Sequence, residues 1–157
     1  MQGKKVLPFI VFSAAALAVG GLSALLSAGG MEAAKTLLQP PYAPPDWLFP
    51  VVWTVLYILM GISAALVWRA GEGAERLRSL RVWTIQLIVN GAWSIIFFAF
   101  ALRGIAFFWV LALIVLVFIM IIRFFRVSRI AALLQVPYFL WICFAARLNL
   151  AVWLLNR

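Results

Sequence analysis

The sequence predicts an all-α integral membrane protein, a bundle of five transmembrane helices, and its proline-rich first loop is a candidate cap over an intramembrane pocket. Two observations predict this class. The 157-residue chain is 68% hydrophobic, with a mean hydropathy of +1.14, and a soluble core of this size could not bury so much apolar surface. Its charged residues, 11% of the chain, gather between long apolar runs, which is typical of helical spans and not of the alternating strands of a β-barrel.

The charge and the residue types exclude several kinds of function. A net charge of +9 would suit nucleic acid, but the basic residues lie at span ends, where they reach lipid headgroups, so we expect no nucleic-acid partner. The chain has no histidine, which excludes His-based metal sites, His acid–base catalysis and a proximal-His haem ligand. We expect no metal site and no required cofactor. The single cysteine, Cys143, cannot form an intramolecular disulfide.

The apolar runs predict five spans within a single domain over residues 1–157. The first span follows Lys4 and Lys5, and a signal peptide is the alternative for this segment. A stripe of small residues along it would let another helix pack closely: Ala16, Gly20, Ala24 and Ala28. A tight turn is predicted at Arg103 and Gly104, and a solvated loop at 69–81. The predicted spans are 6–28, 47–68, 82–101, 105–122 and 130–153.

The distribution of basic residues predicts the orientation. Nine of the 13 Lys and Arg residues fall on the side of the N-terminus and four on the other side. By the positive-inside rule, the N-terminus is cytoplasmic and the first loop lies outside.

The first loop, 29–46, is the most distinctive stretch. Its prolines predict a stiff, extended or turning segment that leads into the second span, with Asp46 as N-cap. A short helix is predicted around 31–38. Such a loop, feeding into a helix that carries Trp47, Trp53 and Tyr57, suits a lid over a pocket. The alternative is that the prolines only end one helix and start the next.

Polar and aromatic side chains share helix faces within the spans. On the third span these are Gln86, Asn90, Trp93 and Phe97; on the second, Trp53, Tyr57, Gly61 and Ala64; on the fifth, Tyr138, Trp141 or Ile142, Ala145 and Asn149. All four carboxylates lie in loops or at a helix start, so a proton relay on a buried carboxylate has no candidate.

These faces allow two interpretations. The asparagine amides need partners in hydrocarbon, and Asn90 could simply join helices. Combined with the aromatic walls, and with the room that Gly61 and Ala145 would leave, the faces also suit a flat aromatic or polycyclic ligand. Arg147 is the one basic residue inside a predicted span. It either reaches the nearby interface or meets an anionic group of a ligand.

Three stretches resemble the TspO/MBR family of tryptophan-rich sensory and translocator proteins, also called peripheral benzodiazepine receptors. They are QPPYAPPDWLF at 39–49 with Trp53, Tyr57 and Gly61; NGAWSIIFF at 90–98; and VPY at 136–138 with Trp141, Ala145 and Asn149. The resemblance covers nearly the whole chain and indicates a bacterial-type member. It implies a five-helix bundle that forms a homodimer and binds hydrophobic small molecules.

The ligands implied by the resemblance are porphyrins such as haem and protoporphyrin IX, and benzodiazepine-type compounds. The implied ligand-binding positions are Ala24, Pro44, Trp53, Tyr57, Asn90, Trp93, Trp141, Ala145 and Leu148. The implied function is a receptor or carrier. The alternative is light- and oxygen-dependent porphyrin degradation, with Trp53 and Trp141 as participants and no conventional catalytic site.

The chain departs from the family pattern at four positions. Tyr42 replaces a tryptophan and Gln39 a lysine in the first loop, and Arg147 replaces a small or neutral residue near the pocket. Leu150 replaces the tyrosine of the cholesterol-recognition pattern, so we do not predict specific cholesterol binding.

Overall fold

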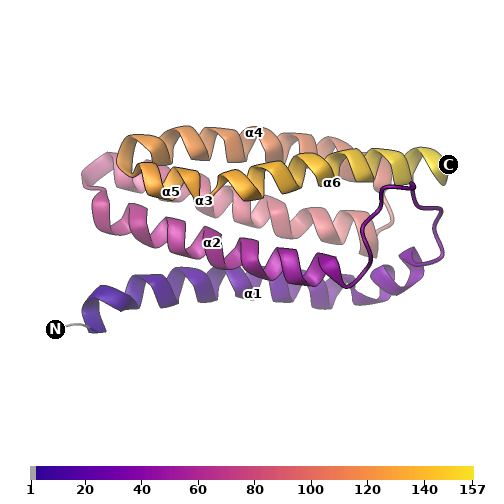
Figure 1. The fold of residues 1–157 in the computed structure, drawn as a ribbon, viewed down its shortest axis with the longest axis horizontal. Helices are drawn as coiled ribbons and strands as arrows, with labels where there is room; N and C mark the ends of the chain where they lie inside the picture. The colour runs from indigo at the N-terminus through magenta and orange to yellow at the C-terminus, as the bar shows by residue number, and fades with distance from the viewer. Residues whose placement is uncertain (1–2) are drawn as a thin grey trace.

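Five long helices run alternately up and down in a computed structural model that describes residues 3–157 (Figure 1). Each of the five helical segments is long and apolar enough to cross a membrane. The described residues form no strand, so the predicted all-α five-span class is confirmed. The elements are α1 (Gly3–Ala34), α2 (Leu48–Ala70), α3 (Gly73–Ser94), the π-helical turn η1 (Ile95–Ala99), α4 (Arg103–Val127), α5 (Arg129–Leu133) and α6 (Val136–Leu155).

Three helices extend well beyond their predicted spans, and one of them is α4, which runs from Arg103 to Val127 and so includes Arg123 and Arg126, expected in a loop. α1 continues to Ala34, so the separate short helix expected around 31–38 is wrong. α3 begins at Gly73, and Arg76, Arg78 and Arg81 therefore lie on a helix and not in a solvated loop. Arginine, glutamate and leucine are good helix formers, so this charged segment extends the helix beyond the apolar run. The connection that remains is short, and Gly73 adopts a φ of 53° there.

The turn between α3 and α4 lies earlier than predicted. Phe100 N–H donates to the Ile95 carbonyl at 3.0 Å, which closes the π-helical turn. Ala101 then takes a φ of 54°, a left-handed conformation that is uncommon for alanine. Arg103 and Gly104, expected in the turn, instead form the first residues of α4.

The fifth segment is a broken helix. Ser128 caps α5, its hydroxyl accepting a 3.3 Å hydrogen bond from the Ala131 N–H. Pro137 lies in the first turn of α6, where helix N–H groups have no intrahelical partner. Ser63 on α2 donates a 2.6 Å hydrogen bond to the Ala131 carbonyl and holds α5 against α2.

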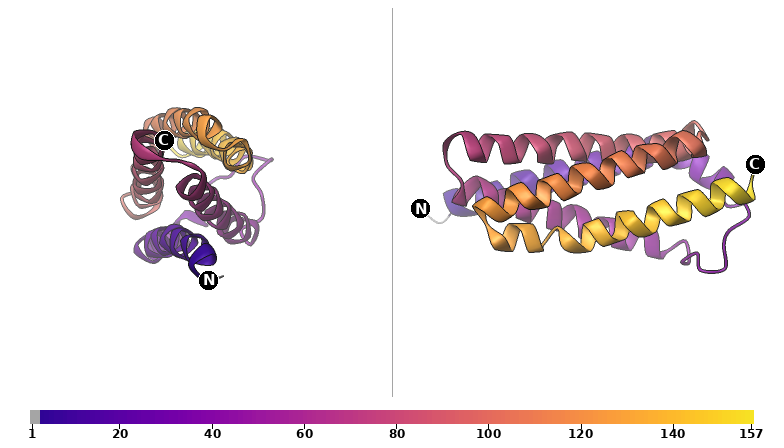
Figure 2. Two further views of the ribbon diagram at one scale, coloured as in Figure 1. Left: turned by 90° about the vertical axis from the view of Figure 1, so that its left-hand side faces the viewer. Right: turned by 90° about the horizontal axis from the view of Figure 1, so that it is seen from above.

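α1 packs closely on α2, and the end view at the left of Figure 2 shows the two helices side by side. A Cβ at Gly61 would collide with the backbone of Ser13, and one at Gly20 with the ring of Tyr57. The space expected beside Gly61 is therefore filled by α1. The buried side of α1 runs through Ala16, Ser23 and Ser27, while Ala24 and Ala28 are exposed.

The first loop crosses the end of the bundle to reach α6 (Figure 1). Leu38 N–H donates to Asn156 Oδ1, and Asn156 Nδ2 donates to the Leu38 carbonyl, both at 3.0 Å. Trp47 occupies the N-cap of α2, and no side chain bonds to the first turn, so the predicted capping by Asp46 is wrong. The Leu48 N–H donates to the Pro45 carbonyl instead, at 3.0 Å.

Candidate ligand site

Four aromatic side chains from three helices meet inside the bundle. The ring of Trp53 on α2 lies 5.7 Å from Tyr57, 6.3 Å from Trp93 on α3 and 6.3 Å from Tyr138 on α6, measured between ring centroids. These spacings are those of favourable tilted and edge-to-face contacts. We call these four side chains the aromatic cluster.

A buried hydrogen-bond chain crosses the bundle beneath this cluster. The Tyr57 hydroxyl donates to Asn90 Oδ1 at 2.6 Å, and Asn90 Nδ2 donates to the Tyr138 hydroxyl at 2.7 Å. The Tyr138 hydroxyl in turn donates to Gln86 Oε1 at 2.9 Å. Hydrocarbon offers these polar groups no partner, so they bond to one another and join α2, α3 and α6, while Gln86 Nε2 is buried without a partner.

A second asparagine ties the site to α4. Trp93 Nε1 donates to Asn149 Oδ1 at 3.2 Å, and Asn149 Nδ2 donates to the Arg103 carbonyl at 2.9 Å. The amide of Asn149 thereby holds the indole of Trp93 in place. The same indole ring contacts the ring of Trp53 within the aromatic cluster.

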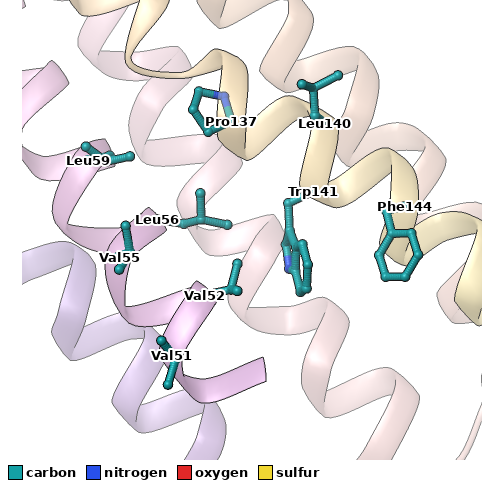
Figure 3. A pocket seen from close by; sticks show the side chains of 9 residues that line it. All are labelled: Val51, Val52, Val55, Leu56, Leu59, Pro137, Leu140, Trp141 and Phe144. Carbon is teal, nitrogen blue, oxygen red and sulfur yellow. The ribbon is translucent and has the colours of Figure 1, made fainter. Parts of the chain in front are cut away.

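A groove lies between α2 and α6, and several of its lining residues directly precede cluster residues in the sequence, as Val52 precedes Trp53, although none of the four cluster side chains lines it. It has a volume of about 440 Å³ and is open on one side. Its walls are apolar: Val51, Val52, Val55, Leu56 and Leu59 from α2, and Pro137, Leu140, Trp141 and Phe144 from α6 (Figure 3). The indole N–H of Trp141 is buried and has no hydrogen-bond partner in the structure. We call this hollow the α2–α6 groove.

Aromatic side chains cover the loop end of the α2–α6 groove. Phe49, in the first turn of α2, lies 6.0 Å from Trp141, and Tyr42 of the first loop lies 6.5 Å from Phe144. The Arg147 guanidinium lies 4.2 Å above the Tyr42 ring. The first loop thus reaches the end of the groove through Tyr42.

The structure brings most of the sequence-predicted site residues into one region. Trp53, Tyr57, Asn90 and Trp93 belong to the aromatic cluster and its hydrogen-bond chain, and Trp141 lines the α2–α6 groove. Others lie apart from these contacts. Pro44 is half-buried in the first loop, Ala145 is buried on α6, Leu148 packs against a small core cluster of Phe97, Ala106 and Val152, and Ala24 is exposed.

Three contributors were absent from the implied ligand-binding positions. Tyr138 joins both the aromatic cluster and the hydrogen-bond chain, Gln86 ends that chain, and Phe144 lines the groove. The helix faces predicted from the sequence already included Gln86 and Tyr138, whereas Phe144 was on none of them, although it lies three residues from Trp141.

The part of the chain that the structure describes, residues 3–157, holds no cluster of three or more His, Cys, Asp or Glu side chains that could bind a metal ion. The site has instead an aromatic wall, an apolar groove and a few neutral amides and hydroxyls. Such a lining suits a hydrophobic small molecule whose orientation is set by few polar contacts.

The fold and the site together define a multi-pass integral membrane protein with an aromatic site between its helices. The model of the TspO/MBR family matches residues 9–154, and the chain belongs to this family. Family membership supports a receptor or transporter role in the membrane.

Several known proteins resemble the chain over most of its length. It is 39% identical to Protein CrtK of Rhodobacter capsulatus, with 94% of this chain and 92% of the relative covered. It is 38% identical to the tryptophan-rich protein TspO of Chlorobaculum tepidum, over 77% of each chain. Identity to the human translocator protein is 35%, over 74% of this chain and 70% of the relative.

Proposed function

We propose that this protein is a membrane receptor or carrier for porphyrins, such as haem and protoporphyrin IX, and for similar flat hydrophobic molecules. The observation that carries the proposal is the position of the apolar α2–α6 groove next to the aromatic cluster, with the unpartnered indole N–H of Trp141 buried beside it. A macrocycle in the groove would bury its faces against valine, leucine and aromatic side chains.

The helices are well suited to hold such a site. The hydrogen-bond chain from Tyr57 to Gln86 crosses three helices and keeps the aromatic rings at fixed angles. A wall that is ordered before the ligand arrives loses little entropy on binding.

A fluorescence titration tests the proposal. Adding protoporphyrin IX at micromolar concentration to the detergent-solubilised protein should quench tryptophan emission to saturation and raise the melting temperature. Trp141→Phe and Asn90→Ala should each weaken binding, because one alters the groove wall and the other breaks the hydrogen-bond chain. Quenching that does not saturate, together with an unchanged melting temperature, would count against a binding role.

A second candidate function is light- and oxygen-dependent degradation of the bound porphyrin. It is favoured by the ring contacts that link Trp53 to Trp93 and Tyr138 beside the groove, since side chains of this kind can exchange electrons with an excited pigment. Illuminated wild type and the Trp53→Phe, Trp141→Phe double variant should then give different products. Identical bleaching in both would argue against an enzymatic role.

The assembly and the orientation stay predictions. We propose a homodimer and a cytoplasmic N-terminus, the latter supported by the arginines around the α2–α3 and α4–α5 connections at one end of the bundle. Crosslinking in native membranes tests the first, and labelling of single cysteines placed in the first loop tests the second.

A further inference from the structure

Arg147 carries a positive charge that no carboxylate neutralises within the described residues. The two ion pairs of residues 3–157 join Lys35 to Glu32 and Arg123 to Glu75, so Arg147 belongs to neither. Its side chain is exposed, and its guanidinium lies 4.2 Å above the Tyr42 ring. A cation–π contact of this kind orients the guanidinium without neutralising its charge.

The position of Arg147 relates this charge to the α2–α6 groove. Arg147 follows Phe144 by three residues and Leu140 by seven, so the three side chains share one face of α6. Leu140 and Phe144 line the groove, and Tyr42 contacts both Phe144 and Arg147. Figure 3 shows Leu140, Trp141 and Phe144 in succession along α6, and the next turn carries Arg147. The guanidinium therefore lies at the loop end of the groove.

The rest of the groove offers a ligand almost no polar contact. All nine lining side chains are apolar or aromatic, and the Trp141 indole N–H is the one polar group among them. Apolar walls hold a hydrophobic body but do not orient it. A planar cation with several N–H donors at one end would orient any ligand that carries a carboxylate.

We propose that Arg147 binds a carboxylate of an amphipathic ligand whose apolar body occupies the α2–α6 groove. The inference rests on the porphyrin function proposed above and specifies its ligand: a tetrapyrrole with free carboxylate side chains, bound with the carboxylates toward the first loop and the macrocycle beside Trp141. Tyr42 holds the guanidinium in place before the ligand binds.

The proposed contact fits the chemistry of this region. A charge-assisted hydrogen bond between guanidinium and carboxylate is stronger than a neutral one, and it strengthens where lipid and protein lower the dielectric constant. The contact between Tyr42 and Arg147 holds this donor at the end of the apolar walls, where a carboxylate of a bound ligand can reach it.

A comparison of two ligands in three proteins tests the inference. Dissociation constants are measured by tryptophan quenching for protoporphyrin IX and for its dimethyl ester, which lacks the carboxylate charges. Wild type should bind the free acid about tenfold more tightly than the ester. Arg147→Gln should remove this preference by weakening binding of the acid alone. Arg157→Gln, which removes a guanidinium stacked 5.6 Å over Trp153 at the same end of the bundle, should retain it.

Each outcome separates this inference from the function on which it rests. If wild type binds acid and ester equally, or if Arg147→Gln retains the preference, the inference is wrong and the porphyrin function stands. Equal weakening of both ligands in Arg147→Gln would mean that Arg147 acts on the loop and not on a carboxylate, and this too overturns it. If wild type binds neither ligand, the proposed function itself fails. The wild-type comparison needs no variant, so it holds even where a substitution impairs folding.

Discussion

The Tyr57 hydroxyl donates a 2.6 Å hydrogen bond to Asn90 Oδ1 and thereby joins α2 to α3 in the buried interior of the helix bundle. Asn90 also joins α3 to α6, because its Nδ2 donates a hydrogen bond to the Tyr138 hydroxyl. One amide thus holds the two tyrosines that, with Trp53 and Trp93, form the aromatic cluster. The stability of the bundle and the shape of the site depend on the same side chain.

Asn90→Ala should lower the free energy of unfolding by about 1–2 kcal/mol, since it breaks both hydrogen bonds and leaves the buried Tyr57 hydroxyl without a partner. Thermal unfolding in detergent measures the effect as a lower melting temperature. Thr54→Val is the control, because that hydroxyl bonds only to the Pro50 carbonyl of its own helix and is exposed. Equal melting temperatures for Asn90→Ala and wild type would mean that the hydrogen-bond chain contributes little.

Gly61→Ala should destabilise the protein by about 1–3 kcal/mol, because the added methyl group meets the backbone of Ser13 and forces α1 away from α2. Gly29→Ala is the matched control: nothing lies within 4 Å of a Cβ at Gly29, and alanine favours the helix over glycine. Thermal unfolding of the two variants should shift in opposite directions. A neutral Gly61→Ala would show that α1 does not pack on α2 this closely.

Asn156→Ala should release the first loop from α6 without unfolding the bundle. The side chain makes both 3.0 Å hydrogen bonds to Leu38, so its loss should speed amide exchange at Leu38 by about tenfold. Hydrogen–deuterium exchange of the peptide that contains Leu38 measures this, with Arg157→Gln as a neighbouring control. Unchanged exchange would indicate that other contacts hold the loop.

The fold class and the main site helices could be predicted from the sequence. Length and hydropathy determine the number of spans, and the spacing of Trp53 and Tyr57, or of Asn90 and Trp93, places each pair on one helix face whatever the packing. The hydrogen-bonding needs of Asn90 in hydrocarbon also required an inward orientation, and the side chain is buried.

What the sequence could not provide was the rotation and separation of the helices. Whether Gly61 faces a ligand or a neighbouring helix depends on how closely α1 approaches, and the structure places Ser13 there. For the same reason the buried side of α1 passes through Ser23 and leaves Ala24 exposed. The α2–α6 groove likewise arises from the spacing of two helices that are far apart in the sequence, and no local pattern encodes it.

The contact between Tyr42 and Arg147 was also beyond sequence reasoning. Each residue stood out alone as a departure from the family pattern, but 105 positions separate them in the chain. Only the path of the first loop across the end of α6 brings the ring under the guanidinium.

Filling the α2–α6 groove tests the central claim most directly. Val55→Trp places a large side chain in the groove, whereas Val115→Trp makes the same change at a similarly exposed position on α4, outside it. Binding is followed through the absorbance of protoporphyrin IX, and melting temperatures verify that both variants fold. Val55→Trp should weaken binding by about tenfold or more, while Val115→Trp binds as wild type does. Wild-type affinity in a folded Val55→Trp protein would contradict a ligand site in this groove.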